Sequence, residues 1–493
     1  MKARALPALI AALLLPATQA YGEGLMEVYE QALSYDSDLA AARAARQARE
    51  AAVDESRAPL LPQLDAFGES SYTERNTLDG DLTSHQYGLQ LSQPLFRANA
   101  WYGFQASQKQ SKVAAAELSR AEQGLMLKVA EQYFNVLRAK DELDTAQAQE
   151  AALRRQWEQA KERYDVGLVA TTEVEEARAG YDASRSQRIA AQSQLDIERE
   201  SLARLTGQFP NALERLETDF PISSPEPDNP EAWAQTALEQ NWELKAQQLT
   251  VAAKSEQVSA ARSEHLPTLD LFARIERQHQ DNNFELPGGS AGAGVQPGAY
   301  SNPMDEYPRT DTTVGLSLNI PLYNGGGTQA GVRRVRSETE QAERELDTVR
   351  RNVRLDARSL FRRITTNVQT INAQRQTIVS SRSALDATRA GYEVGTRNIV
   401  EVLDAEQNYY VALRDYANAR YDYVLNTLRL KQVAGTLSPQ DLQGLDRWLS
   451  ATAPGIERLA RQVTREEREN NGDSGDGEYR RIPSDNVVPL QDQ

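Results

Sequence analysis

The stretch Arg57-Ala-Pro-Leu-Leu-Pro-Gln-Leu-Asp65 returns 205 residues later as Arg262-Ser-Glu-His-Leu-Pro-Thr-Leu-Asp270. Further along, Tyr164-Asp-Val-Gly167 returns as Tyr392-Glu-Val-Gly395, at an offset of 228. Because the matches keep the same order along the chain, they predict a tandem duplication. The larger offset assigns a longer loop to the second copy, and the Gly- and Pro-rich segment 281–309 fits that loop.

Each copy is expected to hold a helix, two strands and two further helices. Strands are expected near 62–74, 83–93, 267–278 and 310–320. The last three alternate between apolar and polar residues, and the first shows a weaker pattern. A soluble sandwich would pack the apolar face on a second sheet, whereas an outer-membrane β-barrel would turn it to lipid. The barrel is favoured by the shortage of other strands and by a secretory signal peptide at residues 1–20, described below. Four strands fall short of the roughly eight that close one, so the barrel requires an oligomer.

The helices are long and carry a coiled-coil pattern. No proline interrupts Phe96–Tyr164, and apolar residues from Leu346 to Tyr392 recur at gaps of 3, 4 and 7. About 70 helical residues would reach roughly 105 Å. We expect each long helix to lie antiparallel to two shorter ones placed end to end, with the Pro-rich linker 210–230 at a joint. These shorter helices are predicted at 171–206, 231–264, 396–434 and 23–57.

The ends of the chain differ from the rest. Residues 1–20 have the charged start, apolar middle and small-residue end of a secretory signal peptide. Residues 21–230 and 231–445 are predicted to be the first and second structural repeats. The remainder, 446–493, forms a C-terminal extension that is expected to be disordered from about 465, because it is polar and poor in large apolar residues.

Composition excludes several classes of function. The formal net charge of -16 leaves no basic footprint, so nucleic acid is not an expected partner. The absence of cysteine excludes disulfides, thiolate metal sites and a lipidated N-terminal cysteine. Only three histidines occur, and no two have metal-ligand spacing on a helix, so neither a metal site nor another cofactor is predicted. Gly325-Gly-Gly327 precedes a heptad helix rather than a βαβ unit, and is expected to let the chain turn from strand to helix. No nucleophile, base and acid form a set, so the protein is not expected to be an enzyme.

The chain resembles the TolC family of outer-membrane efflux and secretion channels over nearly all of its mature length. The motifs that carry the resemblance include Ala58-Pro-Leu-Leu-Pro-Gln-Leu64, Tyr133-Phe-Asn-Val-Leu137, Ala390-Gly-Tyr-Glu-Val-Gly-Thr-Arg397 and Val400-Glu-Val-Leu-Asp404. It is similar to the member that gives the family its name more than to lipid-anchored relatives, which begin with a cysteine that is absent here.

The resemblance implies an α+β fold in which a homotrimer shares one twelve-stranded outer-membrane β-barrel, continued by a coiled-coil α-helical barrel in the periplasm. It implies contact with outer-membrane lipid. It also implies docking to a periplasmic adaptor protein and to an inner-membrane efflux pump or ABC exporter, as in type I secretion. Small toxic compounds, secreted proteins or both would be exported. A structural periplasmic coiled coil or adhesin-like stalk without a pore is the alternative, although it leaves the paired amphipathic strands unexplained.

The resemblance also implies a pore constriction at the far tip of the helices. Glu401 and Asp404 lie three residues apart and so share a helix face. Taken alone, such a pair is more often a solvated surface. In the family the matching positions face the entrance, so a trimer would gather six carboxylates there, a ring that attracts cations.

A gating latch is implied beside that constriction. Arg397 begins a helix, where the helix dipole disfavours a cation, and a carboxylate partner would compensate. By resemblance, the partners of Arg397 are Thr172 and Glu173 on the other hairpin, with Tyr392 in the same latch. The residues expected to contact the adaptor are at the two tip turns: Gly167, Leu168, Val169, Gly395 and Thr396.

Overall fold

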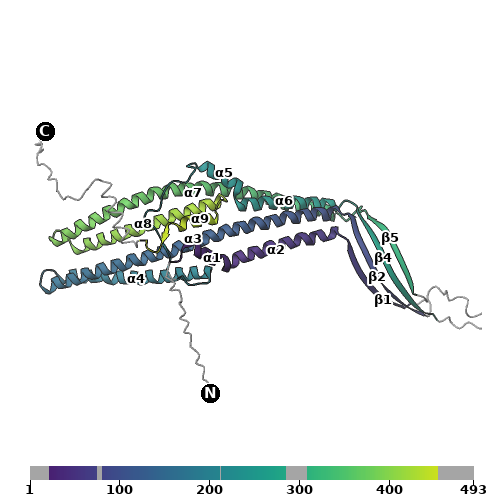
Figure 1. The fold of residues 1–493 in the computed structure, drawn as a ribbon, viewed down its shortest axis with the longest axis horizontal. Helices are drawn as coiled ribbons and strands as arrows, with labels where there is room; N and C mark the ends of the chain where they lie inside the picture. The colour runs from purple at the N-terminus through teal and green to yellow at the C-terminus, as the bar shows by residue number, and fades with distance from the viewer. Residues whose placement is uncertain (1–21, 75–79, 211, 285–307, 454–493) are drawn as a thin grey trace, which may run out of the picture. The chain divides into compact units, whose positions relative to one another are not determined.

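The computed structural model describes residues 22–74, 80–210, 212–284 and 308–453 (Figure 1). Within this part the chain divides into two compact units, and each unit takes segments from both sequence repeats. Unit 1 holds the chain up to Asp36, residues 123–235 and the chain from Asp356 on. Unit 2 holds residues 37–122 and 236–355. The predicted signal peptide, 1–20, lies outside the described residues.

Unit 2 contains an antiparallel sheet of four strands in the order β1-β2-β4-β5 (Figure 1). The strands are β1 (Gln63–Glu74), β2 (Gly80–Phe96), β4 (Thr268–Phe284) and β5 (Arg309–Asn319). All four predicted strands are confirmed, and β2 and β4 are longer than expected. The loop predicted at 281–309 therefore starts too early, since β4 runs to Phe284, and residues 285–307 lie outside the described part.

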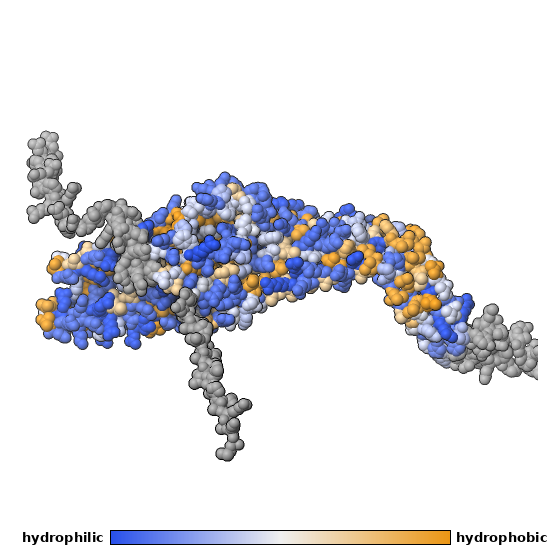
Figure 2. All heavy atoms as spheres, in the orientation of Figure 1, coloured by the Kyte–Doolittle hydropathy of each residue, from blue (hydrophilic) through white to orange (hydrophobic). Residues whose placement is uncertain are grey.

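The two faces of this sheet differ in chemistry. Leu64, Leu91, Ala273 and Val314 stand opposite one another across the four strands, and Figure 2 shows apolar side chains gathered over the sheet. One residue along, the opposite face carries a polar row formed by Asp65, Gln90, Arg274 and Thr313. In that row the Arg274 guanidinium Nε donates to Gln90 Oε1 at 3.2 Å. The alternation read from the sequence is thus a real division into an apolar and a polar face.

The helices of unit 2 extend from the sheet. They are α2 (Ser37–Arg57), α6 (Trp242–Ser263) and the first parts of α3 (Ala98–Asp165) and α7 (Gly327–Glu393), with a short 3₁₀ turn at Ala58–Leu60. Ser107 Oγ donates to the Ala52 carbonyl at 3.1 Å, and Lys254 pairs with Glu338 at 2.9 Å. The predicted glycine turn before α7 is confirmed: Gly325 and Gly326 have φ of 56° and 78°, a region that favours glycine.

Unit 1 is a set of helices built on heptad spacing. It contains the remaining parts of α3 and α7, together with α1 (Leu25–Tyr35), α4 (Thr171–Thr206), α8 (Ile399–Val433), α9 (Pro439–Asp446) and most of α5 (Pro230–Gln240). Four α7 residues at seven-residue spacing are fully buried, as the coiled-coil pattern predicts: Ile364, Ile371, Ile378 and Leu385. The range predicted for α4 is confirmed at both ends.

Two of the predicted helices are each broken in two. The segment 23–57 forms α1 and α2 with Asp36 between them, and 231–264 forms α5 and α6 with Asn241 between them. These breaks are 205 residues apart, at equivalent positions of the two repeats. Asn241 caps α6, because its side-chain oxygen accepts from the Leu244 backbone N–H at 2.9 Å. No proline or glycine stands at either break, so no breaker signal marks them in the sequence.

The linker and the C-terminal segment meet in unit 1. Strand β3 (Arg215–Leu216) pairs with β6 (Leu449–Ser450), an element that was not predicted in the C-terminal extension. Arg215 pairs with Asp144 of α3 at 2.5 Å and lies 3.6 Å from Asp141. Burial raises the pKa of Asp141, although Arg215 opposes the rise. Residues 454–493, and with them the disorder predicted from about 465, lie outside the described part.

Candidate functional site at the helical tip

Two turns form the tip of unit 1, and their backbones are equivalent. In the α3–α4 turn, Gly167 has φ of 77° and the Leu168 N–H donates to the Arg163 carbonyl at 2.8 Å. In the α7–α8 turn, Gly395 has φ of 78° and the Thr396 N–H donates to the Gly391 carbonyl at 2.9 Å. Each is a glycine-terminated helix end of the Schellman type. Both tip turns predicted from the sequence are therefore confirmed.

The residues predicted to contact an adaptor surround these turns. Leu168 is 70% exposed, and Val166 and Val394, which were not predicted, are exposed to a similar extent. Val169 is half-buried. The Thr396 hydroxyl donates to the Gly391 carbonyl at 3.0 Å, so this side chain stabilises its own turn. The tip thus presents small apolar knobs on two glycine turns.

Near the tip, a hydrogen bond joins the α3–α4 hairpin to the α7–α8 hairpin. The Tyr392 hydroxyl on α7 donates to Glu173 Oε1 on α4, and the Arg163 guanidinium of α3 lies 4.9 Å from the centre of the Tyr392 ring. Burial and the bond to Glu173 raise the pKa of Tyr392 to about 12. The phenol therefore keeps its proton, and can donate, throughout the physiological range. Two of the four predicted latch residues are in direct contact.

Arg397 is bonded within its own helix start. Its guanidinium pairs with Glu401, four residues on, rather than with Thr172 or Glu173. Glu401 also accepts from the Asn398 N–H at 3.3 Å, while Asn398 Oδ1 accepts from the Glu401 N–H at 2.9 Å, so the two residues form a capping box. The bond to Arg397 lowers the pKa of Glu401. Thr172 is exposed.

The carboxylate pair predicted to line a constriction has a counterpart in the first repeat. Glu401 is half-buried and Asp404 is exposed on α8. Residues 228 positions earlier, on α4, are Glu173 and Glu176. Both hairpins therefore carry two acids three residues apart in the first turns of the returning helix. Glu176 was not predicted as a site residue, although it lies 228 positions before Asp404, at the offset that relates the two repeats.

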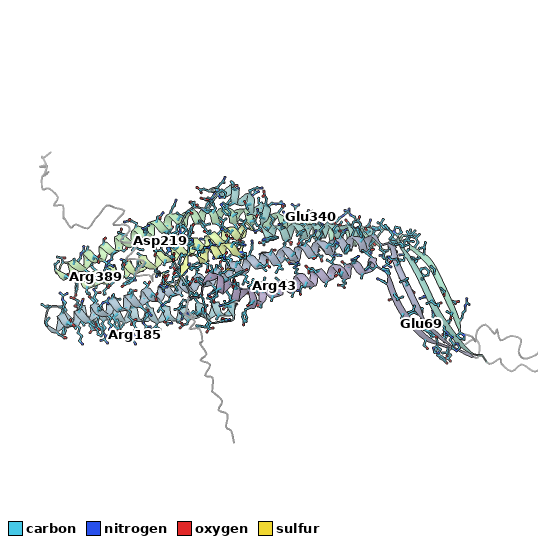
Figure 3. All side chains as sticks on the ribbon, viewed as in Figure 1. Arg43, Glu69, Arg185, Asp219, Glu340 and Arg389 are labelled. Atoms are coloured by element: carbon cyan, nitrogen blue, oxygen red, sulfur yellow. The ribbon has the colours of Figure 1, made fainter. Side chains whose placement is uncertain are left out.

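A buried ion pair behind the tip was also missed. Glu406 of α8 is only 2% exposed and pairs with Arg389 of α7; Figure 3 shows Arg389 towards the end of its helix. Burial raises the pKa of Glu406, and Arg389 opposes the rise. Both side chains line a cleft of about 640 Å³ with Arg155 and Arg163. The sequence did hold a sign of this ion pair. Glu406 lies at helical spacing between Val402 and Tyr409, which are buried on the same face of α8.

The α4 and α8 helices pack closely near the tip. A Cβ atom built on Gly180 would lie 3.4 Å from the Leu403 side chain, which is van der Waals contact. This places α4 against α8, behind the Tyr392–Glu173 bond. In the part of the chain that is described, no group of three or more acids and histidines is arranged to hold a metal ion, and no described helix is long and apolar enough to cross a membrane.

Comparisons with known proteins agree with this architecture. The model of the family described as "Outer membrane efflux protein" matches two segments, residues 28–208 and 233–436. Outer membrane protein TolC of Escherichia coli K12 is 36% identical over 433 residues, which cover 87% of this chain and 85% of that protein. Its counterpart from Vibrio cholerae is 34% identical over 431 residues, with 87% and 94% covered.

A solved structure extends the comparison to the fold. The outer membrane protein VceC from Vibrio cholerae superposes with a TM-score of 0.70 at 18% sequence identity, over 83% of this chain and 96% of that chain. The model match to both halves of the chain confirms the tandem duplication inferred from the repeated motifs.

Proposed function

Since this chain belongs to the outer membrane efflux protein family, we propose that three copies assemble into one channel that crosses the outer membrane and extends into the periplasm. The main observation that supports a trimer is the open edge on each side of the sheet in unit 2. Its outer strands, β1 and β5, have no neighbour on their outward sides in the described chain. Unpaired edges demand a partner strand or protection.

The number of strands fits closure by copies of the same chain. Neighbours alternate in direction from β1 to β5, so β5 of one copy would run antiparallel to β1 of the next. Four strands from each of three copies make twelve, which is within the range of closed outer-membrane barrels. The apolar row that includes Leu91 and Val314 would face lipid, and the polar row that includes Gln90 and Arg274 would face the lumen.

The helical tip would be the periplasmic entrance. In a trimer the Glu401 and Asp404 carboxylates of three copies would approach one axis and favour the passage of cations. The contact between Tyr392 and Glu173 would hold the two hairpins of each copy together and restrict the opening. Thr172 and Arg397 would adjoin this latch, with Arg397 acting through Glu401.

The partners would dock at the exposed turns. Leu168 and its neighbours, together with Gly395 and Thr396, would form the surface for a periplasmic adaptor protein. The adaptor would couple the channel to an inner-membrane efflux pump or ABC exporter. Small toxic compounds, secreted proteins or both are the proposed cargo. The function is transport rather than catalysis.

Assembly and conduction test this proposal together. The purified protein is expected to have the mass of a trimer by light scattering in detergent, and to form cation-selective pores in planar bilayers. A folded monomer with its full β content would overturn the shared barrel. A trimer that never conducts, even after adaptor is added, would favour the stalk-like alternative over a channel.

A further inference from the structure

Two of the three histidines in this chain stand side by side in the sheet. His85 on β2 and His279 on β4 are direct partners in the antiparallel register, and Figure 1 shows these two strands as neighbours. They are 194 positions apart in the sequence, and they come from different repeats. Helix spacing, which argued against an imidazole metal site, does not apply to them, because only strand pairing brings them together.

Directly opposed residues of an antiparallel pair share one face of the sheet, with Cβ atoms about 4.5–5.5 Å apart. Metal–nitrogen distances for imidazole are about 2.0–2.1 Å, so an ion placed between two such rings can be reached by both. His85 is exposed and His279 is half-buried. The pair lies on the same face as Leu89 and Leu91, but nearer the strand ends away from the helices, beyond Tyr87 and Arg277. The face is no longer apolar there, so water can complete the coordination shell.

We propose that His85 and His279 form a binding site for one divalent transition metal ion, of the kind that prefers imidazole nitrogen: Cu²⁺, Ni²⁺ or Zn²⁺. The described residues add no third protein ligand, so water fills the other positions and the affinity is moderate. Arg277 lies two residues along β4 on the same face and opposite Tyr87. Its positive charge does not attract a cation, so imidazole coordination supplies the binding.

A bound ion would join the two sequence repeats. The β2–β4 ladder is the only strand pairing between them in this four-stranded sheet as described, and the metal would link its two strands through side chains. An ion that binds only the folded sheet stabilises it by mass action. Because both ligands belong to one chain, the site does not depend on trimer formation or on conduction.

The test measures Cu²⁺ binding by the full-length protein, purified in detergent without a histidine tag. Isothermal titration should give one ion per chain, and the electron paramagnetic resonance spectrum should show nitrogen ligands. His85→Gln and His279→Gln should each weaken Cu²⁺ binding by about tenfold or more, because even the loss of a residue that only supports a metal ligand costs about 10–100-fold in affinity. Cu²⁺ should also raise the melting temperature of the wild type but not of either variant.

His265→Gln is the matched control, since His265 is the remaining histidine and is exposed outside the strand pair. It should bind Cu²⁺ as the wild type does. Binding that survives both single substitutions, or that is lost equally in His265→Gln, would overturn the site. Wild type that shows no nitrogen-ligated Cu²⁺ would overturn it as well. Trimer mass, measured on the same samples, tests the channel separately.

Discussion

The two tip turns have the same backbone and different side-chain contacts. Glu173 and Glu401 occupy the same helical position, 228 residues apart, three residues after the N-cap. Glu401 is held by its own helix start, through Asn398 and Arg397. Glu173 instead accepts from Tyr392 on the other hairpin.

Two substitutions between the repeats explain this difference. Where the second repeat has Asn398 and Arg397, the first has Ala170 and Val169. Ala170 provides no side-chain cap, and Val169 provides no cation four residues before Glu173. This carboxylate is therefore available for a contact outside its own helix. A duplicated position has thus become a cap in one copy and a cross-hairpin contact in the other.

Removal of the cross-hairpin bond should have the largest effect. Tyr392→Phe deletes only the hydroxyl that donates to Glu173. A hydrogen bond contributes about 0.5–1.5 kcal/mol. Three symmetric copies acting together, at about 1–3 kcal/mol, would shift an open–closed equilibrium by roughly 5–150-fold. Resting conductance in planar bilayers should rise, while trimer mass and thermal stability stay nearly unchanged.

Tyr164→Phe is the control for that experiment, because Tyr164 is the equivalent tyrosine of the first repeat and is exposed. The pKa of Tyr392 is raised to about 12 from the ordinary value of about 10. It sets the pH range in which the hydroxyl can donate to Glu173. Stabilisation from this phenol is complete below about pH 10 and is lost as the pH rises through its raised value. Equal conductance in both variants would remove Tyr392 from the gate.

A smaller effect is expected when the first turn is given the arginine of the second. Val169→Arg places a cation four residues before Glu173, where a helical pair stabilises by about 0.2–0.5 kcal/mol. The new arginine should compete with Tyr392 for the carboxylate and raise resting conductance about twofold. Val169→Gln, which adds length without charge, should conduct like the wild type. If the two variants conduct alike, Glu173 is not open to local competition.

The most local effect should come from exchanging the caps. Asn398→Ala removes the cap of α8 and should destabilise its first turn by about 1 kcal/mol. Ala170→Asn should stabilise the first turn of α4 by a similar or smaller amount. Amide hydrogen exchange at the two helix starts measures both changes. Exchange should quicken only in α8 for the first variant and slow only in α4 for the second; a change at the wrong helix would contradict the capping assignment.

Local patterns predicted local structure well. Alternation located three of the four long strands, and the repeated motif helped to place the first. The seven-residue spacing of Ile371 and Ile378 identified a buried seam. Glycines 167 and 395 marked both tip turns, because a positive φ is a property of one residue. The breaks at Asp36 and Asn241 were missed, since no proline or glycine stands there. Family resemblance assigned Arg397 a partner on the other hairpin, whereas the structure shows the i,i+4 pair with Glu401, which forms at little cost in chain entropy.

The sequence by itself determined the duplication, the amphipathic strands, the heptad helices and the glycine turns, because each depends on residues close together in the chain. Only the tertiary structure decided which distant side chains meet. Tyr392 and Glu173 are 219 residues apart. Arg389 of α7 pairs with Glu406 of α8, on the other side of the turn between these helices. His85 meets His279 through strand register alone. Such placements depend on how whole hairpins and strands pack. For the buried Glu406, burial also demands the pairing, since an unpaired polar group in the interior is costly.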